Sequence, residues 1–387
     1  MNTRKRGEIG MAKKLISVWL SLTILLFSSI SIYAGDNVRG DFFIKDISIN
    51  GQQIINYQMD DPVFLYKNAT YLPLNAEMGK ILGLKIELDM ESRTLKLWKA
   101  ESTQNNLSQR WMKNNKQDVK TEILSNVSVV AYETAGEKTA ETAKDAVNKT
   151  ADAKAQSDQD TVIELPKLDA KQLDMQGMPV LVKGKVPYIP VNAITSNGLF
   201  GWDVYFDSYT GIYISTKESV KAKSLFNEPR SRYNRGLVNY IKKYNGSYTT
   251  DKAQNLVFLF QHEANIYGVD QMLLMAVAHR ESTFNASAKS SSGSLGMMQI
   301  MPSTAARYGI SATQLLDPNV NVGFGAKYLK ERIDAYGGNV TKALSAYNQG
   351  SVAVNRGSYS TRYAAKILST QSNLKSYLSS GGYGTGK

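Results

Sequence analysis

Two hydrophobic periodicities divide the chain. Over residues 41–99 and 166–216, apolar and polar residues alternate with a period of two, which predicts half-buried β-strands. The pair Asn50-Gly51 follows one alternating run and predicts a hairpin turn. Over residues 232–368, apolar residues recur every three or four positions, which is typical of amphipathic helices. We therefore expect an α+β multidomain protein with strands in its N-terminal part and helices in its C-terminal part.

The β-rich part contains an internal repeat. The sequence Tyr-Leu-Pro-Leu-Asn-Ala at 71–76 recurs as Tyr-Ile-Pro-Val-Asn-Ala at 188–193. Each copy continues through a predicted helix, a glycine, an alternating strand, a turn and a last strand. The copies, at 41–99 and 166–216, predict a small domain built from two related β-α-β units.

The remaining domain borders follow from composition. The stretch at 100–165, between the repeats, is rich in Ala, Lys, Thr, Asp and Glu, so it has too few large apolar residues to fold alone. We expect it to be a flexible insertion within the repeat domain at 41–216. A basic, polar linker at 217–231 then leads to a helical domain at 232–370, and a flexible tail follows at 371–387.

The N-terminus has the pattern of a secretory signal peptide. Basic residues at 4–6, 13 and 14 precede an apolar run that ends near Ala34, a small residue suited to cleavage. Residues 1–34 are therefore a predicted signal peptide, and an uncleaved membrane anchor is the alternative. We expect a protein secreted to the cell envelope or cell wall.

Charge and composition narrow the chemistry. The formal net charge is +12, and +8 remains after removal of residues 1–34, so an exported form would be attracted to anionic wall polymers. Charge alone does not establish such a partner, and neither a nucleic-acid partner nor a specific protein partner is inferred. The chain has no cysteine and only His262 and His279, so neither disulfides nor a metal site is expected. No cofactor is predicted.

One glutamate lies on an apolar helix face. A predicted helix opens with Asp270 at a capping position, and Leu274, Val277 and Glu281 follow on one face. Burial raises the pKa of a carboxyl group, and a raised pKa suits a general acid. The alternative is that Glu281 caps the helix or pairs with a cation such as Arg280.

Several sequence blocks surround Glu281 in a definite order. They are residues 279–285, 292–302, 316–321, 325–329 and 343–350, followed by Tyr363. In this order and spacing they resemble the lytic transglycosylases of the SLT type, which are related in fold to goose-type lysozyme. The match spans about residues 251–368. It implies a mainly α-helical, lysozyme-like domain that cleaves the glycan strands of bacterial peptidoglycan.

The resemblance assigns roles to individual residues. It implies that Glu281 is the single catalytic acid and base. It also implies substrate-binding or substrate-side positions at Ser282, Met298, Gln299, Tyr347, Asn348 and Tyr363. The sequence departs from the family pattern at Met297, Gln349 and Ala364, where leucine, alanine and valine are usual. The stretch just before Tyr363 also matches poorly.

The implied reaction is a nonhydrolytic cleavage of the bond between MurNAc and GlcNAc. Glu281 would protonate the glycosidic oxygen and then deprotonate the C6 hydroxyl of MurNAc, which closes a 1,6-anhydro ring. The substrate's own acetamido group would stabilise the intermediate, so no second carboxylate is needed. Two alternatives stay open: a hydrolytic muramidase on the same fold, and a catalytically silent protein that only binds the wall.

The N-terminal repeats resemble the copper amine oxidase N-terminal domain, a stalk-like module of secreted bacterial proteins. The resemblance covers about residues 41–99 and 166–216 and implies a spacer or wall-binding role. Neither repeat contains His or Cys, so we expect no copper site in them.

Overall fold

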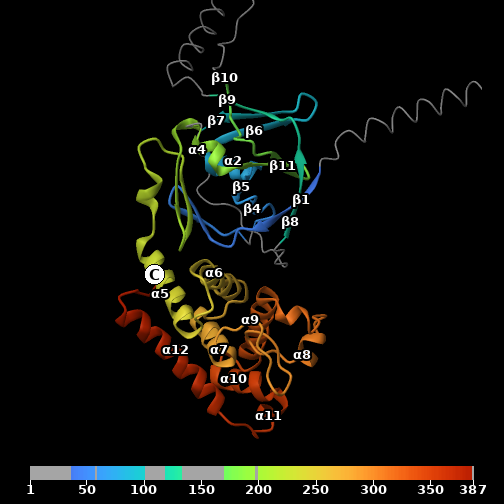
Figure 1. Ribbon diagram of the computed structural model, residues 1–387, viewed down its shortest axis with the longest axis vertical. Helices are drawn as coiled ribbons and strands as arrows, with labels where there is room; N and C mark the ends of the chain where they lie inside the picture. Colours follow the sequence, from blue (N-terminus) through green and yellow to red (C-terminus); the bar gives the residue numbers. More distant parts are fainter. Residues whose placement is uncertain (1–35, 57–58, 101–117, 133–169, 197–198, 386–387) are drawn as a thin grey trace, which may run out of the picture. The chain divides into compact units, whose positions relative to one another are not determined.

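The computed structural model describes residues 36–385, apart from 57–58, 101–117, 133–169 and 197–198 (Figure 1). The predicted signal peptide at 1–34 and much of the predicted insertion lie outside the described residues. The chain forms two compact units, and each unit collects several separate segments. Of the described residues, those up to 43, within 54–203 and at 215–220 form the barrel unit, and those at 44–53, 204–214 and from 221 onward form the helical unit.

A closed barrel of six strands forms the centre of the barrel unit (Figure 1). In order around the barrel, the strands are β1(Asn37–Phe42), β4(Phe64–Tyr66), β5(Ala69–Pro73), β12(Val186–Pro190), β11(Val180–Lys183) and β8(Asp118–Leu124). Phe64, Tyr71, Leu181 and Tyr188 are fully buried and pack together as a core. The rings of Phe64 and Tyr71 stack at 5.6 Å. Gly40 allows this packing, since a Cβ there would lie 2.2 Å from the Phe64 ring.

The two copies of the repeated sequence meet inside this barrel. Strand β5 carries the first copy and β12 the second, and they pair antiparallel with Leu72 opposite Ile189. A short helix follows each strand, and the two helices are α2(Ala76–Leu82) and α4(Val191–Ser196). Asn75 caps α2 by accepting a hydrogen bond from the backbone N–H of Met78, and Gly83 ends the helix in the left-handed conformation.

Each four-stranded sheet combines strands from both copies. In the barrel unit the order is β10(Ala170–Gln172), β9(Ser128–Tyr132), β7(Thr94–Lys99) and β6(Leu84–Asp89). In the helical unit it is β13(Asp203–Asp207), β14(Gly211–Ser215), β2(Asp46–Ile49) and β3(Gln52–Ile54). The β7–β9 and β14–β2 pairs are both parallel. Asn50 and Gly51 form the predicted turn between β2 and β3, both with positive φ.

These pairings correct the prediction of two small β-α-β units. The period of two identified several strands but gave no information on their partners, which are far away in the sequence. The prediction that residues 100–165 are a flexible insertion was also wrong for part of that range, because β8 and β9 lie there. The alternating residues at 119–131 form a short stretch next to a long polar segment, so the composition of the whole range does not reveal these strands.

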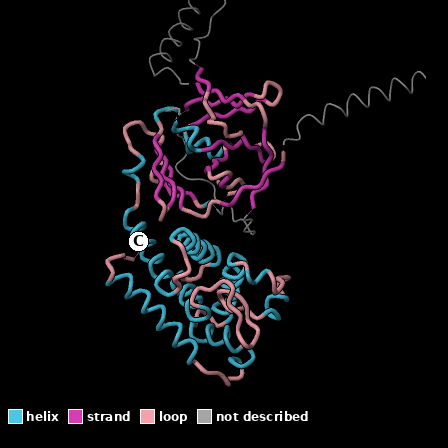
Figure 2. The backbone as a smooth tube through the Cα atoms, in the orientation of Figure 1, coloured by secondary structure: helices cyan, strands magenta, loops and turns pink. Residues whose placement is uncertain are grey.

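Helices form most of the helical unit (Figure 2). They are α5(Glu228–Tyr244), α6(Thr250–Tyr267), α7(Gln271–Ser282), α8(Pro302–Ala306), α9(Pro318–Ala335), α10(Val340–Gln349), α11(Ser351–Asn355) and α12(Arg362–Ser380), with short 3₁₀ turns η3(Ala222–Leu225) and η4(Gln314–Leu316). A further 3₁₀ turn, η2(Leu199–Gly201), belongs to the barrel unit. None of the described helices has the length and hydrophobicity that a membrane span requires.

Helix α7 runs through the core of the helical unit. Its residues 273–278 are all buried, and it packs most closely against α12 and also against α6. The predicted signals around it are confirmed. Gly268 ends α6 in the left-handed conformation, and the Asp270 side chain accepts a hydrogen bond from the backbone N–H of Leu273. A helix buried over this length is well suited to hold a side chain at its end in a fixed position.

The small sheet of the helical unit is attached to the helices by polar contacts. Arg230 on α5 donates two hydrogen bonds to the carboxylate of Asp46, at 2.5 and 3.2 Å. Asn234, also on α5, donates to the backbone oxygen of Tyr209 at 2.6 Å. Strands from the predicted repeat domain therefore belong to the same compact unit as the predicted catalytic helices.

Two predicted borders fall inside regular structure. The linker predicted at 217–231 contains η3 and the first residues of α5, whose N-terminus is capped by Asn227. The tail predicted at 371–387 begins within α12, which continues to Ser380 and buries Leu374 and Leu378. The apolar residues in these segments are few but regularly spaced, so composition alone gave them too little weight.

Candidate active site

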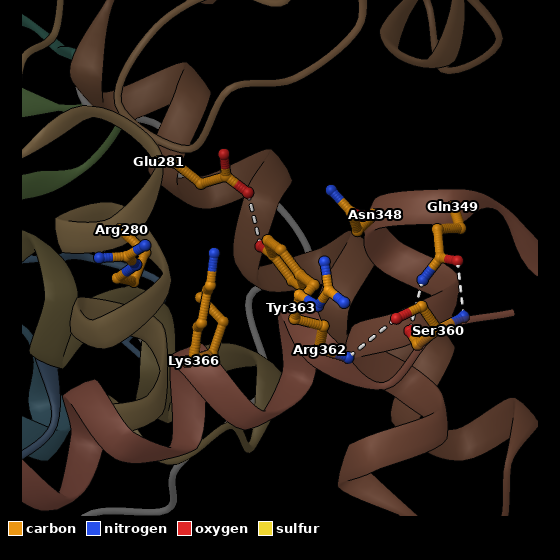
Figure 3. Close-up of a pocket in the computed structure, with 9 residues that line it drawn as sticks. Arg280, Glu281, Asn348, Gln349, Ser360, Arg362, Tyr363 and Lys366 are labelled. Carbon is orange, nitrogen blue, oxygen red and sulfur yellow. Dashed lines mark hydrogen bonds between the residues drawn. The ribbon is translucent and has the colours of Figure 1, made fainter.

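An open cleft of about 490 Å³ lies in the helical unit, where the end of α7, the end of α10 and the start of α12 come together (Figure 3). Its lining consists of one carboxylate, three cations, several uncharged polar groups and one apolar side chain. The lining residues are Arg280, Glu281, Asn348, Gln349, Ser360, Arg362, Tyr363, Lys366 and Ile367.

Local backbone geometry places Glu281 at the cleft. The residue lies in the last turn of α7, and Thr283 ends the helix in the left-handed conformation with φ 55°. Phe284 also has a positive φ, and its ring is fully buried in the core of the helical unit. This anchor turns the chain away directly after Glu281, so the carboxylate can face the cleft.

Two opposing effects act on the pKa of Glu281. Burial raises it, because the charged carboxylate loses contact with water. A hydrogen bond from the hydroxyl of Tyr363 to Oε1, at 2.5 Å, and the charge of Arg280 both lower it. The burial effect is larger, so the pKa of Glu281 lies above its ordinary value. A carboxyl group in this state keeps its proton closer to neutral pH than an exposed glutamate does.

Tyr363 acts as a fixed hydrogen-bond donor to Glu281. Burial raises the pKa of its hydroxyl, and the charge of Glu281 raises it further. The hydroxyl therefore stays protonated and donates to Oε1, which leaves Oε2 of Glu281 for another partner. The residues just before Tyr363 match the family pattern poorly, yet the structure places Tyr363 directly against Glu281 (Figure 3).

Ser282 is engaged with the protein backbone. Its hydroxyl donates to the backbone oxygen of Met297 at 2.8 Å and accepts from the backbone N–H of Asn285 at 3.0 Å. Ser282 does not line the cleft. The side chain therefore joins the end of α7 to the segment at 295–300.

Gln299 is likewise held within the protein. Its amide nitrogen donates to the backbone oxygens of Gly296 and Ala288, at 2.8 and 3.2 Å. Its amide oxygen accepts from the hydroxyl of Ser294 at 2.7 Å. The backbone of Gln299 has a positive φ of 49°, which this set of hydrogen bonds helps to hold. Gln299 does not line the cleft either.

Tyr347 and Met298 pack behind the cleft. The hydroxyl of Tyr347 donates to the backbone oxygen of Met298 at 3.0 Å, and its ring lies 5.5 Å from that of Tyr328. Met298 is fully buried, and a Cβ at Gly325 would approach its side chain to 2.8 Å. Like Ser282 and Gln299, these two residues lie in or contact the segment at 295–300 and do not line the cleft.

Sequence reasoning assigned no role to Asn321, which organises the same segment. Asn321 is fully buried on α9, and its amide nitrogen donates to the backbone oxygens of Leu295 and Leu315 at 3.0 and 2.9 Å. Its oxygen accepts from the backbone N–H of Met298 at 2.6 Å. Asn321 ends one of the blocks that carry the family resemblance, so a buried asparagine in that block was the available signal.

The rest of the lining combines one predicted substrate-binding residue with residues that had no predicted role. Asn348, a predicted substrate-binding residue, is exposed and lines the cleft. Gln349 and Ser360 line it as well and are joined by two hydrogen bonds, at 2.7 and 2.9 Å. Arg362 and Lys366, on the first turns of α12, had no assigned role. Among the described residues, no group of three or more His, Cys, Asp or Glu side chains is arranged to hold a metal ion.

Residues 258–369 match the family model described as the transglycosylase SLT domain. This match confirms the SLT resemblance for this part of the chain, which is mainly helical as the sequence predicted. The comparisons give no support to the resemblance between the N-terminal repeats and the copper amine oxidase module.

Known proteins similar to this chain include two transglycosylases and one solved structure. The transglycosylase of Enterobacteria phage PRD1 is 37% identical over 102 residues, which is 26% of this chain and 37% of the phage protein. The membrane-bound lytic murein transglycosylase C of Histophilus somni strain 2336 is 31% identical over 162 residues, 37% of this chain and 45% of the relative. The crystal structure of the 70 kDa soluble lytic transglycosylase of Escherichia coli is 25% identical, covers 40% of this chain and 29% of that chain, and has a TM-score of 0.27. In each case the chain spans less than half of the similar protein.

Proposed function

We propose that this protein is a peptidoglycan lytic transglycosylase. It cleaves the β-1,4 bond between MurNAc and GlcNAc and leaves 1,6-anhydroMurNAc ends. The SLT domain supports the reaction class, and the cleft geometry supports the chemistry. The observation that carries the proposal is a half-buried Glu281 with a raised pKa that lines an open cleft beside a neutral hydrogen-bond donor, Tyr363.

Glu281 serves as acid and then as base. In the first step its protonated carboxyl group gives a proton to the glycosidic oxygen, and the raised pKa makes this form available. The carboxylate that remains is stabilised by the hydroxyl of Tyr363 on Oε1. It then takes the proton from the C6 hydroxyl of MurNAc, and the C6 oxygen closes the 1,6-anhydro ring.

The lining of the cleft supports a mechanism without a second carboxylate. Glycosidases that retain or invert configuration generally use a pair of acidic residues on either side of the bond. Glu281 is the only acid among the described residues that line this cleft. The acetamido group of the substrate would then stabilise the positive charge that develops at the sugar, as the family resemblance implies.

The remaining lining groups are available to hold the glycan. Asn348 lies across the cleft from Glu281 with its side chain exposed (Figure 3). We propose that it binds the reacting sugar. Ser282, Met298, Gln299 and Tyr347 act indirectly, by holding the segment at 295–300 against the end of α7.

The protein would work in the cell envelope, where its substrate is found. The sequence of residues 1–34 supports export, and the net charge of +8 on the remaining residues supports attraction to anionic wall polymers. A spacer or wall-binding role for the barrel unit is a further part of the proposal. Sedimentation of the Glu281→Gln protein with purified walls at increasing salt would test this role. If the bound fraction does not change with salt concentration, electrostatic attraction to the wall is contradicted.

The decisive experiment is mass spectrometry of purified peptidoglycan after digestion. The wild-type protein should release anhydro-muropeptides, and Glu281→Gln should release none. Glu228→Gln, which neutralises an exposed acid on α5 outside the cleft, should retain full activity. Products heavier by about 18 Da, the mass of one added water, would show hydrolysis and contradict the lyase mechanism. No product from the wild-type protein would favour a wall-binding role.

A further inference from the structure

The candidate cleft contains a group of cations that the proposed reaction does not use. Arg280 directly precedes Glu281 on α7, and Arg362 and Lys366 lie in the first turns of α12. All three side chains are exposed and line the cleft. Figure 3 shows Arg280 and Lys366 on one side of Tyr363 and Arg362 toward Asn348.

Exposed cations commonly form salt bridges with acids on the same helix. Arg232 and Glu228 on α5 make such a pair, one turn apart. Within the described part of the chain, no salt bridge joins Arg280, Arg362 or Lys366 to an acid. Their charges are therefore not neutralised by the protein, although all three lie around one concave surface.

The cleft consequently has a positive potential. Three cations line it against one carboxylate, that of Glu281, whose pKa is raised by burial. The N-terminus of α12 also lies at the cleft. Its first backbone N–H, that of Arg362, donates to the Ser360 hydroxyl at 3.2 Å, and Thr361 makes no capping hydrogen bond, so the positive end of the helix dipole adds to the field. Charges of one sign around a cleft concentrate the field and attract a ligand of opposite charge.

We propose that Arg362 and Lys366, assisted by Arg280, bind a carboxylate of the murein strand beside the bond that is cleaved. This inference rests on the proposed function and adds a substrate preference to it. Each MurNAc carries a lactyl group on O3. That group is a free carboxylate when the stem peptide has been removed, and otherwise it carries a peptide with carboxylates of its own. Guanidinium and ammonium groups bind both kinds of carboxylate through charge-assisted hydrogen bonds.

A carboxylate fits the proposed reaction better than a phosphate does. Wall phosphates are attached to MurNAc through its C6 oxygen, and that oxygen must be a free hydroxyl to close the anhydro ring. A phosphate on the reacting sugar would therefore block the product. The lactyl group on O3 leaves the C6 hydroxyl free, so it is compatible with cleavage at the same sugar.

The test measures kcat and KM on three kinds of strand: strands without stem peptides, strands with native stems, and native strands whose carboxylates have been converted to amides. The proteins are the wild type, the double variant Arg362→Gln/Lys366→Gln, and Lys375→Gln. Lys375 is an exposed cation on α12 that does not line the cleft, so its variant controls for loss of charge on the same helix.

The wild-type protein and the Lys375→Gln control should prefer at least one of the two carboxylate-bearing strands over amidated strands, on the order of tenfold in kcat/KM and mainly through KM. Increasing salt should weaken this preference. The double variant should cleave all three strands with nearly equal efficiency. The better substrate among the two unmodified strands identifies the source of the carboxylate, lactyl or peptide.

Two results would overturn the inference alone: equal cleavage of all three strands by the wild type, or an unchanged preference in the double variant. Failure of the wild type to release anhydro product from any strand would instead refute the proposed function. Binding of the same strands to the Glu281→Gln protein, with and without the double substitution, tests carboxylate recognition independently of cleavage.

Discussion

Replacement of Asn321 by alanine should destabilise the helical unit and disturb the cleft together. The Asn321 amide makes hydrogen bonds to three buried backbone groups, those of Leu295, Leu315 and Met298. An ordinary hydrogen bond contributes about 1 kcal/mol, and a buried group left without its partner costs about 1–3 kcal/mol. We therefore expect Asn321→Ala to lower the free energy of unfolding by about 3–5 kcal/mol.

The effect should extend to activity because the same hydrogen bonds hold the segment at 295–300. Ser282, next to Glu281, bonds to the backbone of Met297 in that segment. A displacement of the segment would therefore change the position of the catalytic carboxylate. Small misplacements of this kind can reduce rates by about 100-fold, so a fall in kcat/KM of at least about tenfold is expected.

Circular dichroism during urea unfolding measures the stability, and hydrogen exchange measures protection of the Met298 amide. Asn321→Asp keeps the volume but loses the two donated hydrogen bonds, so it should be at least as unstable as Asn321→Ala. Asn373→Ala, at an exposed position on α12, serves as the control and should be nearly neutral. If Asn321→Ala unfolds within about 1 kcal/mol of the wild type, with Met298 still protected, the hydrogen-bond argument is wrong.

Three further outcomes are expected. Tyr363→Phe removes the hydrogen bond that lowers the pKa of Glu281, so that pKa should rise, and the alkaline limb of the activity profile should move to higher pH; an unmoved limb would contradict this role. Burial lowers the pKa of His262 to about 4, so between pH 6.5 and 4 only the unfolded chain takes up a proton at this residue. The free energy of unfolding of the wild type should therefore fall by about 3 kcal/mol over this range because of His262, and that of His262→Asn should lack this contribution. Equal pH dependence of the unfolding free energy in the wild type and the variant would contradict this role of His262. Asp46→Asn leaves Arg230 without its partner, and should lower the unfolding free energy by about 2 kcal/mol; no change would mean that the small sheet does not stabilise the helices.

The elements with local signals were predicted well from the sequence. Helix α7 has a capping aspartate at its start and a glycine just before it, and both signals act within a few residues. The hairpin between β2 and β3 depends on Asn50 and Gly51, which adopt the positive φ that its turn requires. In each case the residues that determine the structure are neighbours in the chain.

The strand pairing could not be predicted in the same way. Strand β14 pairs with β2, although Gly211 and Asp46 are far apart in the sequence. A period of two shows which face of a strand is buried, but several other strands have the same pattern and could serve as partners. The sequence therefore indicated strands and a repeat but not the barrel. It also did not indicate that four of these strands belong to the helical unit.

The family resemblance located the site but did not distinguish residues that line the cleft from residues that hold the backbone behind it. Glu281, Asn348 and Tyr363 line the cleft, whereas Ser282, Gln299 and Tyr347 do not. The polar groups of that second set bond to backbone atoms, which is a three-dimensional property that a motif does not record. The cations of α12 were missed for the opposite reason, because an isolated arginine or lysine on a helix has no distinguishing pattern.

The departures from the family pattern near the C-terminal end of the site are related to one another. Gln349 stands where alanine is usual, and the stretch before Tyr363 matches poorly. In the structure the Gln349 amide donates to the backbone oxygen of Ser360 at 2.7 Å and accepts from its N–H at 2.9 Å. Alanine could form neither hydrogen bond, so the glutamine provides an anchor for the divergent segment. Because Tyr363 follows three residues after Ser360 and holds Glu281, this anchor helps to maintain the position of the catalytic carboxylate.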